Sequence, residues 1–175
     1  EPVNVNRLSS DGNVIAVYKD SVVKGSIAVT GSGIGIQLGG TGTANTLDDY
    51  EEGTFTATLT SVPTAPTNPP TATGSYTKVG NRVHFEIFRW SNVDTSGGSG
   101  EMRITGLPFT ASTATITQNV ATYGMNFDTS RFQWCEISTT IIYFVQSGNG
   151  TSWSNWDITA GTGKYLSISG SYQTS

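Results

Sequence analysis

The sequence has a single cysteine, Cys135, and a single histidine, His84. One cysteine cannot build an intrachain disulfide framework or a cysteine-rich metal site, so stability must come from packing or from oligomerisation. No serine or cysteine nucleophile lies in a recognisable elbow motif near His84, which disfavours a histidine-based catalytic triad. The sequence therefore predicts no metal site, no cofactor and no triad.

Basic residues are also few. The chain has 9 lysines and arginines against 13 aspartates and glutamates, for a net charge of −4. Nucleic-acid binding depends on clustered Lys and Arg that neutralise phosphates, and these scattered residues form no such patch. No apolar run is long enough to span a bilayer. We expect neither a nucleic-acid partner nor membrane insertion.

Strong helix formers are sparse, and no long stretch has an apolar period of 3.6 residues. Glycine occurs 21 times, threonine 27 times and serine 20 times, whereas only 13% of the residues are charged. Threonine favours strands, and glycine and serine favour turns. The composition therefore predicts an all-β protein.

Residues 1–46 are typical of a fibre shaft. Strands are expected at Val14–Tyr18 and Val22–Val29, and then Ile34, Ile36 and Leu38 recur with a period of two. One thin apolar row cannot offset the entropy of ordering some forty residues, at about 1–2 kcal/mol each. We therefore expect three copies to bury these rows against one another in a homotrimeric, intertwined β shaft. The alternative is a disordered linker.

Residues 47–175 contain regularly spaced strand patterns that predict an antiparallel, jelly-roll-like β-sandwich head. The clearest is a hairpin that turns at Gly80-Asn81, with Val83, Phe85 and Ile87 on one face of its second strand and His84, Glu86 and Phe88 on the other. Prolines between residues 63 and 70 predict a surface loop that does not pair. Further strands are expected at Thr54–Thr60, Met102–Leu107, Ala114–Tyr123, Phe132–Ser138, Thr140–Gln146 and Tyr165–Tyr172.

Three motifs occur in order: LDDYEEGTFT at residues 47–56, GSYTKVGNRV at 74–83 and ITGLPF at 104–109. Together with NRLSSDG at residues 6–12, they resemble the shaft-plus-head C-terminal region of bacteriophage tail-fibre proteins. The resemblance implies a homotrimeric virion appendage, extracellular when it acts, that is joined to other virion proteins upstream and meets the host surface with its head. The shared motifs are scaffold, so no functional residue carries over.

The unshared part of the head, residues 111–163, is where recognition is expected to vary. Within it, Trp153, Asn155 and Trp156 lie in a polar loop, and exposed indoles with polar neighbours are suited to stacking on sugars. The alternative is that one or both tryptophans cap the core or a subunit interface. Trp90 and Tyr123 are candidates for a second contact surface, although core packing is the competing role for Trp90.

Two further hypotheses concern the acidic side chains. Asp48, Asp49, Glu51 and Glu52 would form an acidic hinge, and the alternative of a calcium site lacks the spacing of a standard loop. Glycoside cleavage needs two suitably separated carboxylates, but no spacing singles out a pair. Those available are Glu86, Glu101, Asp128, Glu136 and Asp157.

These observations predict a phage tail-fibre tip that attaches to host-surface glycan or another outer-membrane receptor and is not an enzyme. Two alternatives remain open from the sequence. One is a structural or decoration protein that contacts other virion components, and the other is a polysaccharide depolymerase.

Overall fold

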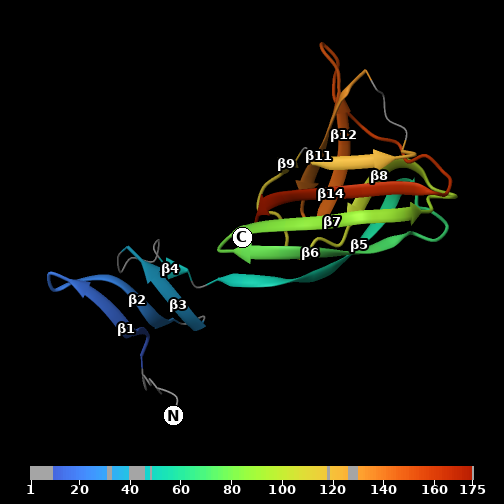
Figure 1. The fold of residues 1–175 in the computed structure, drawn as a ribbon. Helices are drawn as coiled ribbons and strands as arrows, with labels where there is room; N and C mark the ends of the chain where they lie inside the picture. Colours follow the sequence, from blue (N-terminus) through green and yellow to red (C-terminus); the bar gives the residue numbers. More distant parts are fainter. Residues whose placement is uncertain are drawn as a thin grey trace. The chain divides into compact units, whose positions relative to one another are not determined.

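The computed structural model describes residues 10–30, 33–39, 46–47, 49–117, 119–125 and 130–174. All regular secondary structure in these residues is β-strand, arranged in two antiparallel sheets (Figure 1). The prediction of an all-β, antiparallel protein is confirmed. Within the same residues there is no helix of the length and apolarity needed to cross a bilayer.

The chain divides into two compact units, Glu1–Glu51 with Lys78–Gly80, and Glu52–Thr77 with Asn81–Ser175. The sequence analysis placed the boundary after residue 46, and the division falls after Glu51. Lys78 belongs to the first unit, where its Nζ forms an ion pair with Asp49 Oδ2. A segment from the head sequence therefore helps to hold the end of the first unit.

The first unit contains a four-stranded sheet in the order β1-β2-β3-β4. Its strands are β1 (Gly12–Lys19), β2 (Val22–Thr30), β3 (Gly33–Leu38) and β4 (Thr46–Leu47). Asp20 and Ser21 connect β1 to β2 with φ of 53° and 63°, the left-handed backbone that a two-residue hairpin turn requires. Both predicted strands of this hairpin are confirmed.

The two faces of this small sheet differ in chemistry. On one face, the ladder pairs Ile15 with Ile27, Ile27 with Ile36 and Ile36 with Leu47, and each of these side chains is more than a third exposed. On the other face, Ser26 Oγ lies 2.9 Å from Asn13 Oδ1 and 2.5 Å from Gln37 Oε1. A continuous apolar row thus crosses all four strands and remains exposed in the single chain.

The second unit is built on a ten-stranded sheet whose main path runs β10-β14-β7-β6-β5-β8-β12-β11-β9, with β13 added beside β12. The sheet is curled, and its strands β14 and β9 come into contact. Figure 1 shows β14, β7 and β6 side by side. The bounds are β5 (Tyr50–Thr64), β6 (Thr71–Val79), β7 (Arg82–Val93), β8 (Ser99–Thr105), β9 (Thr115–Thr117), β10 (Val120–Tyr123), β11 (Phe132–Ser138), β12 (Ile141–Ser147), β13 (Ser154–Asn155) and β14 (Lys164–Gln173).

Alternate residues of each strand fill the interior of this curled sheet. On β7, Val83, Phe85 and Ile87 are buried, while His84, Glu86 and Phe88 are exposed, as the alternation predicts. Side chains from β8, β11 and β12 meet them from the other part of the sheet and form one core cluster. The core therefore unites strands that are distant in the ladder, and the opposite face of every strand is left for solvent or ligands.

One strand prediction is wrong, and one loop prediction is only partly correct. Ala114–Tyr123 was expected as one strand, but β9 pairs with β11 and β10 pairs with β14. The proline-rich segment is also less detached than expected, because Pro63 lies in β5 opposite Gly100 and Pro66 is buried. Short strands at the ends of a sheet carry little periodic signal, and proline can occupy a strand where its missing N–H is not needed.

The core predicts a position-specific loss of stability on β12. Ile142 is fully buried and lies opposite Ile104 and Ile137, whereas its neighbour Ile141 is only half-buried. We expect Ile142→Ala to lower the free energy of unfolding by about 2–5 kcal/mol, because it removes buried methyl groups and leaves a cavity. Chemical denaturation measures the effect. Ile141→Ala is the matched control, with a loss of about 1 kcal/mol or less, and equal losses would contradict the assignment of the core face.

Candidate functional site

The predicted tryptophan loop is attached to the sheet by β13. Asn155 pairs with Val145 and Ser154 with Gln146 in the ladder to β12. Trp156 follows directly and points into the core, where its Nε1 donates a 3.0 Å hydrogen bond to the Val145 carbonyl and its ring lies 5.3 Å from that of Phe144. The Trp156 side chain is 1% exposed. The prediction that Trp156 contacts a ligand is therefore wrong, because this side chain closes the core.

Trp153 has the opposite environment and is 61% exposed. It borders a hollow of about 310 Å³ on the outer face of β11, β12 and β13, which we call the Trp153 hollow. Its lining combines an indole, a phenol, a carboxylate, an amide and a hydroxyl, from Trp153, Tyr143, Glu136, Asn155 and Ser138, with Val145 beneath them. The structure thus brings together two of the predicted residues, Trp153 and Asn155, with Glu136, which was named only as a carboxylate available for glycoside cleavage. Tyr143 and Ser138 were not predicted as site residues.

A charged pair beside the hollow positions Asn155. Arg103 Nη2 donates a 2.7 Å hydrogen bond to Glu101 Oε2, and its guanidinium carbon lies 5.1 Å from the centre of the Tyr143 ring. Glu101 also has a hydrogen bond with the Asn155 side chain. The Arg103 hydrogen bond first, and the Asn155 hydrogen bond second, lower the pKa of Glu101 below its ordinary value. Both partners thus favour the charged carboxylate.

The face around the hollow also contains two nitrogen donors without a hydrogen-bond partner among the described residues. These are Nε of Arg103 and Nε1 of Trp134, and both atoms are buried. Arg103 lies opposite Tyr143, and Trp134 lies opposite Val145, so both residues belong to the strands that carry the hollow. Buried donors of this kind usually have an acceptor. These two donors therefore have no acceptor within the described chain.

The other two predicted contact residues do not join this site. Trp90 lies opposite Leu166 in the core and is 7% exposed, so its proposed contact role is wrong and the competing packing role is correct. Tyr123 is 73% exposed on β10, opposite Tyr165. The side chains of Trp90 and Tyr123 lie on opposite faces of the sheet. In the strand order, β10 is at one end, whereas β11 is next to the other end.

The structure brings only some of the candidate carboxylates near one another. Asp48 and Asp128 lie outside the described residues. Glu101 and Glu136 flank β12 on β8 and β11, whereas Glu86 belongs to β7. A general acid for glycoside cleavage needs a raised pKa, and the pKa of Glu101 is lowered. Within the described part of the chain, no three His, Cys, Asp or Glu side chains are grouped to hold a metal ion.

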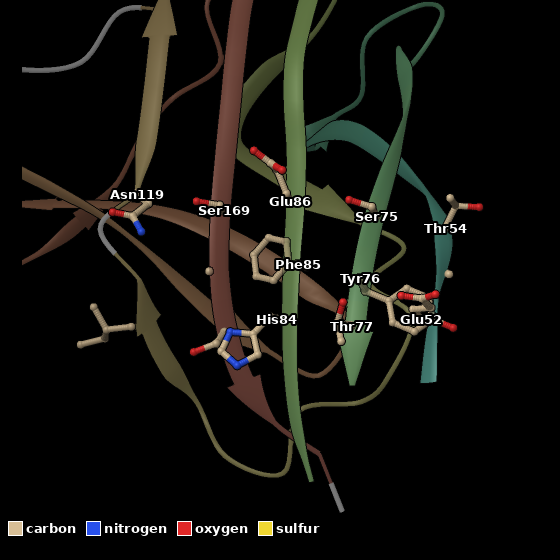
Figure 2. A pocket seen from close by; sticks show the side chains of 14 residues that line it. Glu52, Thr54, Ser75, Tyr76, Thr77, His84, Phe85, Glu86, Asn119 and Ser169 are labelled. Atoms are coloured by element: carbon tan, nitrogen blue, oxygen red, sulfur yellow. The ribbon is translucent and has the colours of Figure 1, made fainter. Parts of the chain in front are cut away.

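A larger groove, of about 880 Å³, crosses the outer face of β5, β6, β7 and β14 (Figure 2). It is mainly polar, and we call it the sheet groove. Its lining residues are Glu52, Gly53, Thr54, Ser75, Tyr76, Thr77, His84, Phe85, Glu86, Ile116, Asn119, Ser169, Gly170 and Ser171. Sequence reasoning missed it, because alternation put His84 and Glu86 on an outer face without revealing which strands lie beside them.

Comparison with known proteins adds no family assignment. No protein-family model matches the chain, and no curated protein matches it. The three sequence motifs and the geometry described above therefore carry the functional argument.

The Glu101 contacts predict a measurable change in acidity. In Arg103→Gln, the pKa of Glu101 should rise toward 4.5, because the largest cause of its lowering is removed. Asn155→Ala should raise it less. The contribution of this carboxylate to stability is present above pH 4.5 and is lost as the pH falls through the lowered pKa. An NMR titration of the Glu101 carboxyl carbon measures the pKa of Glu101 in both variants. An unchanged midpoint in Arg103→Gln would show that Arg103 does not lower this pKa.

Proposed function

We propose that this chain is the tip of a phage tail fibre and attaches to the host surface by binding glycan in the Trp153 hollow. The observation that carries the proposal is the exposure of Trp153 beside Asn155, Glu136 and Tyr143. An exposed indole offers an apolar face to a sugar ring, while the amide, carboxylate and hydroxyl groups around it can bond to sugar hydroxyls. The resemblance to phage tail-fibre proteins supports the same role.

The rigidity of the surroundings favours binding. Asn155 is held by the ladder to β12 and by Glu101, and Tyr143 lies against the Arg103 guanidinium. Side chains that are already ordered lose less conformational entropy when a ligand binds. A site of this size suits one or two sugar rings, so each single site would bind weakly.

Trimerisation would compensate for that weakness. We infer that the apolar row Ile15, Ile27, Ile36 and Leu47 packs against the same row in two further copies. A single-layer sheet with an exposed apolar face has no core of its own, and small sheets need such a covering to be stable. Three linked sites can exceed single-site affinity by about 10²–10⁴ when they bind together. As part of the same proposal, the head is a jelly-roll-like β-sandwich, and the chain is joined upstream to other virion proteins.

The glycan hypothesis is tested by Trp153→Ala. We expect binding of the labelled protein to host cells to fall about 30-fold or more, because a central aromatic contact of this kind is worth about 2 kcal/mol or more. Trp153→Phe should retain part of the binding. Phe132→Ala, which removes another aromatic ring that is 77% exposed, is the control. Full binding by Trp153→Ala would refute this site, and binding to purified virions instead of cells would favour a structural role.

The trimer is tested by light scattering of the intact chain. We expect a mass near three times 18.5 kDa. Ile36→Asp should shift the mass toward that of one chain, because it places a charge in the centre of the apolar row. Ala16→Asp, on the opposite face beside Ser26, should leave the mass unchanged. A monomeric wild-type protein would rule out trimerisation, whatever the host-cell assay shows.

A further inference from the structure

The sheet groove borders the Trp153 hollow and is chemically different from it. It lies mainly on β5, β6, β7 and β14, whereas the hollow lies on β11, β12 and β13, and Ile116 of the groove lies opposite Glu136 of the hollow in the ladder between β9 and β11. The groove is also more than twice as large, at about 880 Å³ against 310 Å³. We propose that it binds an extended oligosaccharide that carries no acidic groups, as a second glycan site of this head.

The groove presents hydroxyl groups in a regular array. In the ladder, His84 lies opposite Ser171 and Glu86 lies opposite Ser169. Figure 2 shows Ser75 and Thr77 on the neighbouring strand β6, beside Glu86 and His84. Side chains in such rows are about 4.8 Å apart across the strands and about 7 Å apart along them. This spacing is comparable with that between neighbouring rings of a glycan chain, so several sugars can meet a polar side chain at once.

The charge of the lining restricts which charge a ligand of the groove can carry. Glu52 and Glu86 contribute carboxylates, and no lysine or arginine is among the described residues that line the groove. A ligand with uronic acid, sialic acid or phosphate groups would be repelled and would find no cationic partner. A neutral sugar chain is compatible with the lining, and an amino sugar would gain charge-assisted hydrogen bonds to the carboxylates.

The position of the groove disfavours a peptide strand as occupant. β7 and β6 lie between β14 and β5 in the sheet order, so the backbone N–H and C=O groups of these two central strands are engaged with neighbouring strands. A peptide that binds as an added strand needs a free sheet edge. The groove is lined mainly by side chains, and most of them carry hydroxyl, carboxyl, amide or imidazole groups.

A second copy of the chain also fits the groove poorly. The centre of a stable protein interface is enriched in aromatic and apolar side chains and depleted in charged ones. Ile116, which is 64% exposed, is the one large and strongly exposed apolar side chain among the described residues that line the groove. The polar array is better matched to sugar hydroxyls than to the surface of another head.

Three hexasaccharides test the proposal on the intact protein. Chitohexaose is neutral, its de-acetylated form is cationic at mildly acidic pH, and oligogalacturonate is anionic. We expect calorimetry and NMR to show binding of the first two, with shifts at His84, Ser75 and Ser169, and no binding of the third. Glu86→Gln should weaken the cationic probe about tenfold and leave the neutral probe within about twofold.

A blocking variant gives an independent readout. Ser75→Tyr places a ring in the groove and should abolish binding of the neutral probe. Thr71→Tyr is the matched control, because it is exposed on the same strand about 13 Å away and should bind normally. Trp153→Ala should retain groove binding, so the outcome is distinct from that of the Trp153 hollow. Failure of all three probes to shift the groove resonances, or normal binding by Ser75→Tyr, would overturn the proposal.

Discussion

Burial of alternate side chains inside one curled sheet is the constraint on which the rest of the second unit depends. Phe85 cannot enter the core unless His84 and Glu86 point outward, and Phe144 cannot enter unless Tyr143 and Val145 do so. The core and the two outer sites therefore both result from the alternation of side chains along each strand. Most side chains of the groove and the hollow come from the strands that build the core, and the loop before β13 adds Trp153.

The first unit follows the same period with a different outcome. Its strands are paired as regularly as those of the second unit, yet the apolar row that crosses them has no covering layer within the described chain. In the second unit, the sheet curls and covers its own apolar face. The four-stranded sheet has no second layer among the described residues, and the proposed trimer would supply its covering.

The sequence predicted the local structure of strong strands better than their arrangement. The β6–β7 hairpin and its two faces follow from a turn sequence and a clear alternation, and both are local signals. The split of residues 114–123 into β9 and β10 depends on pairing with strands far away in the chain, which no local pattern encodes. The same limit applies to the sites. Trp153 and Asn155 could be proposed from an aromatic in a polar loop, but Glu101, Arg103 and Tyr143 join them only through the register of β8 and β12.

The two tryptophans of the β13 segment lie in opposite environments, one in the core and one in solvent. Trp156 is anchored by its indole hydrogen bond and by Phe144, and Trp153, three positions earlier, faces solvent. Substitutions at Trp153 and the residues around it can therefore accumulate with little effect on the core. In the proposed function, a scaffold of this kind would change its receptor, and with it the range of hosts, through exposed positions alone while the fold beneath is retained.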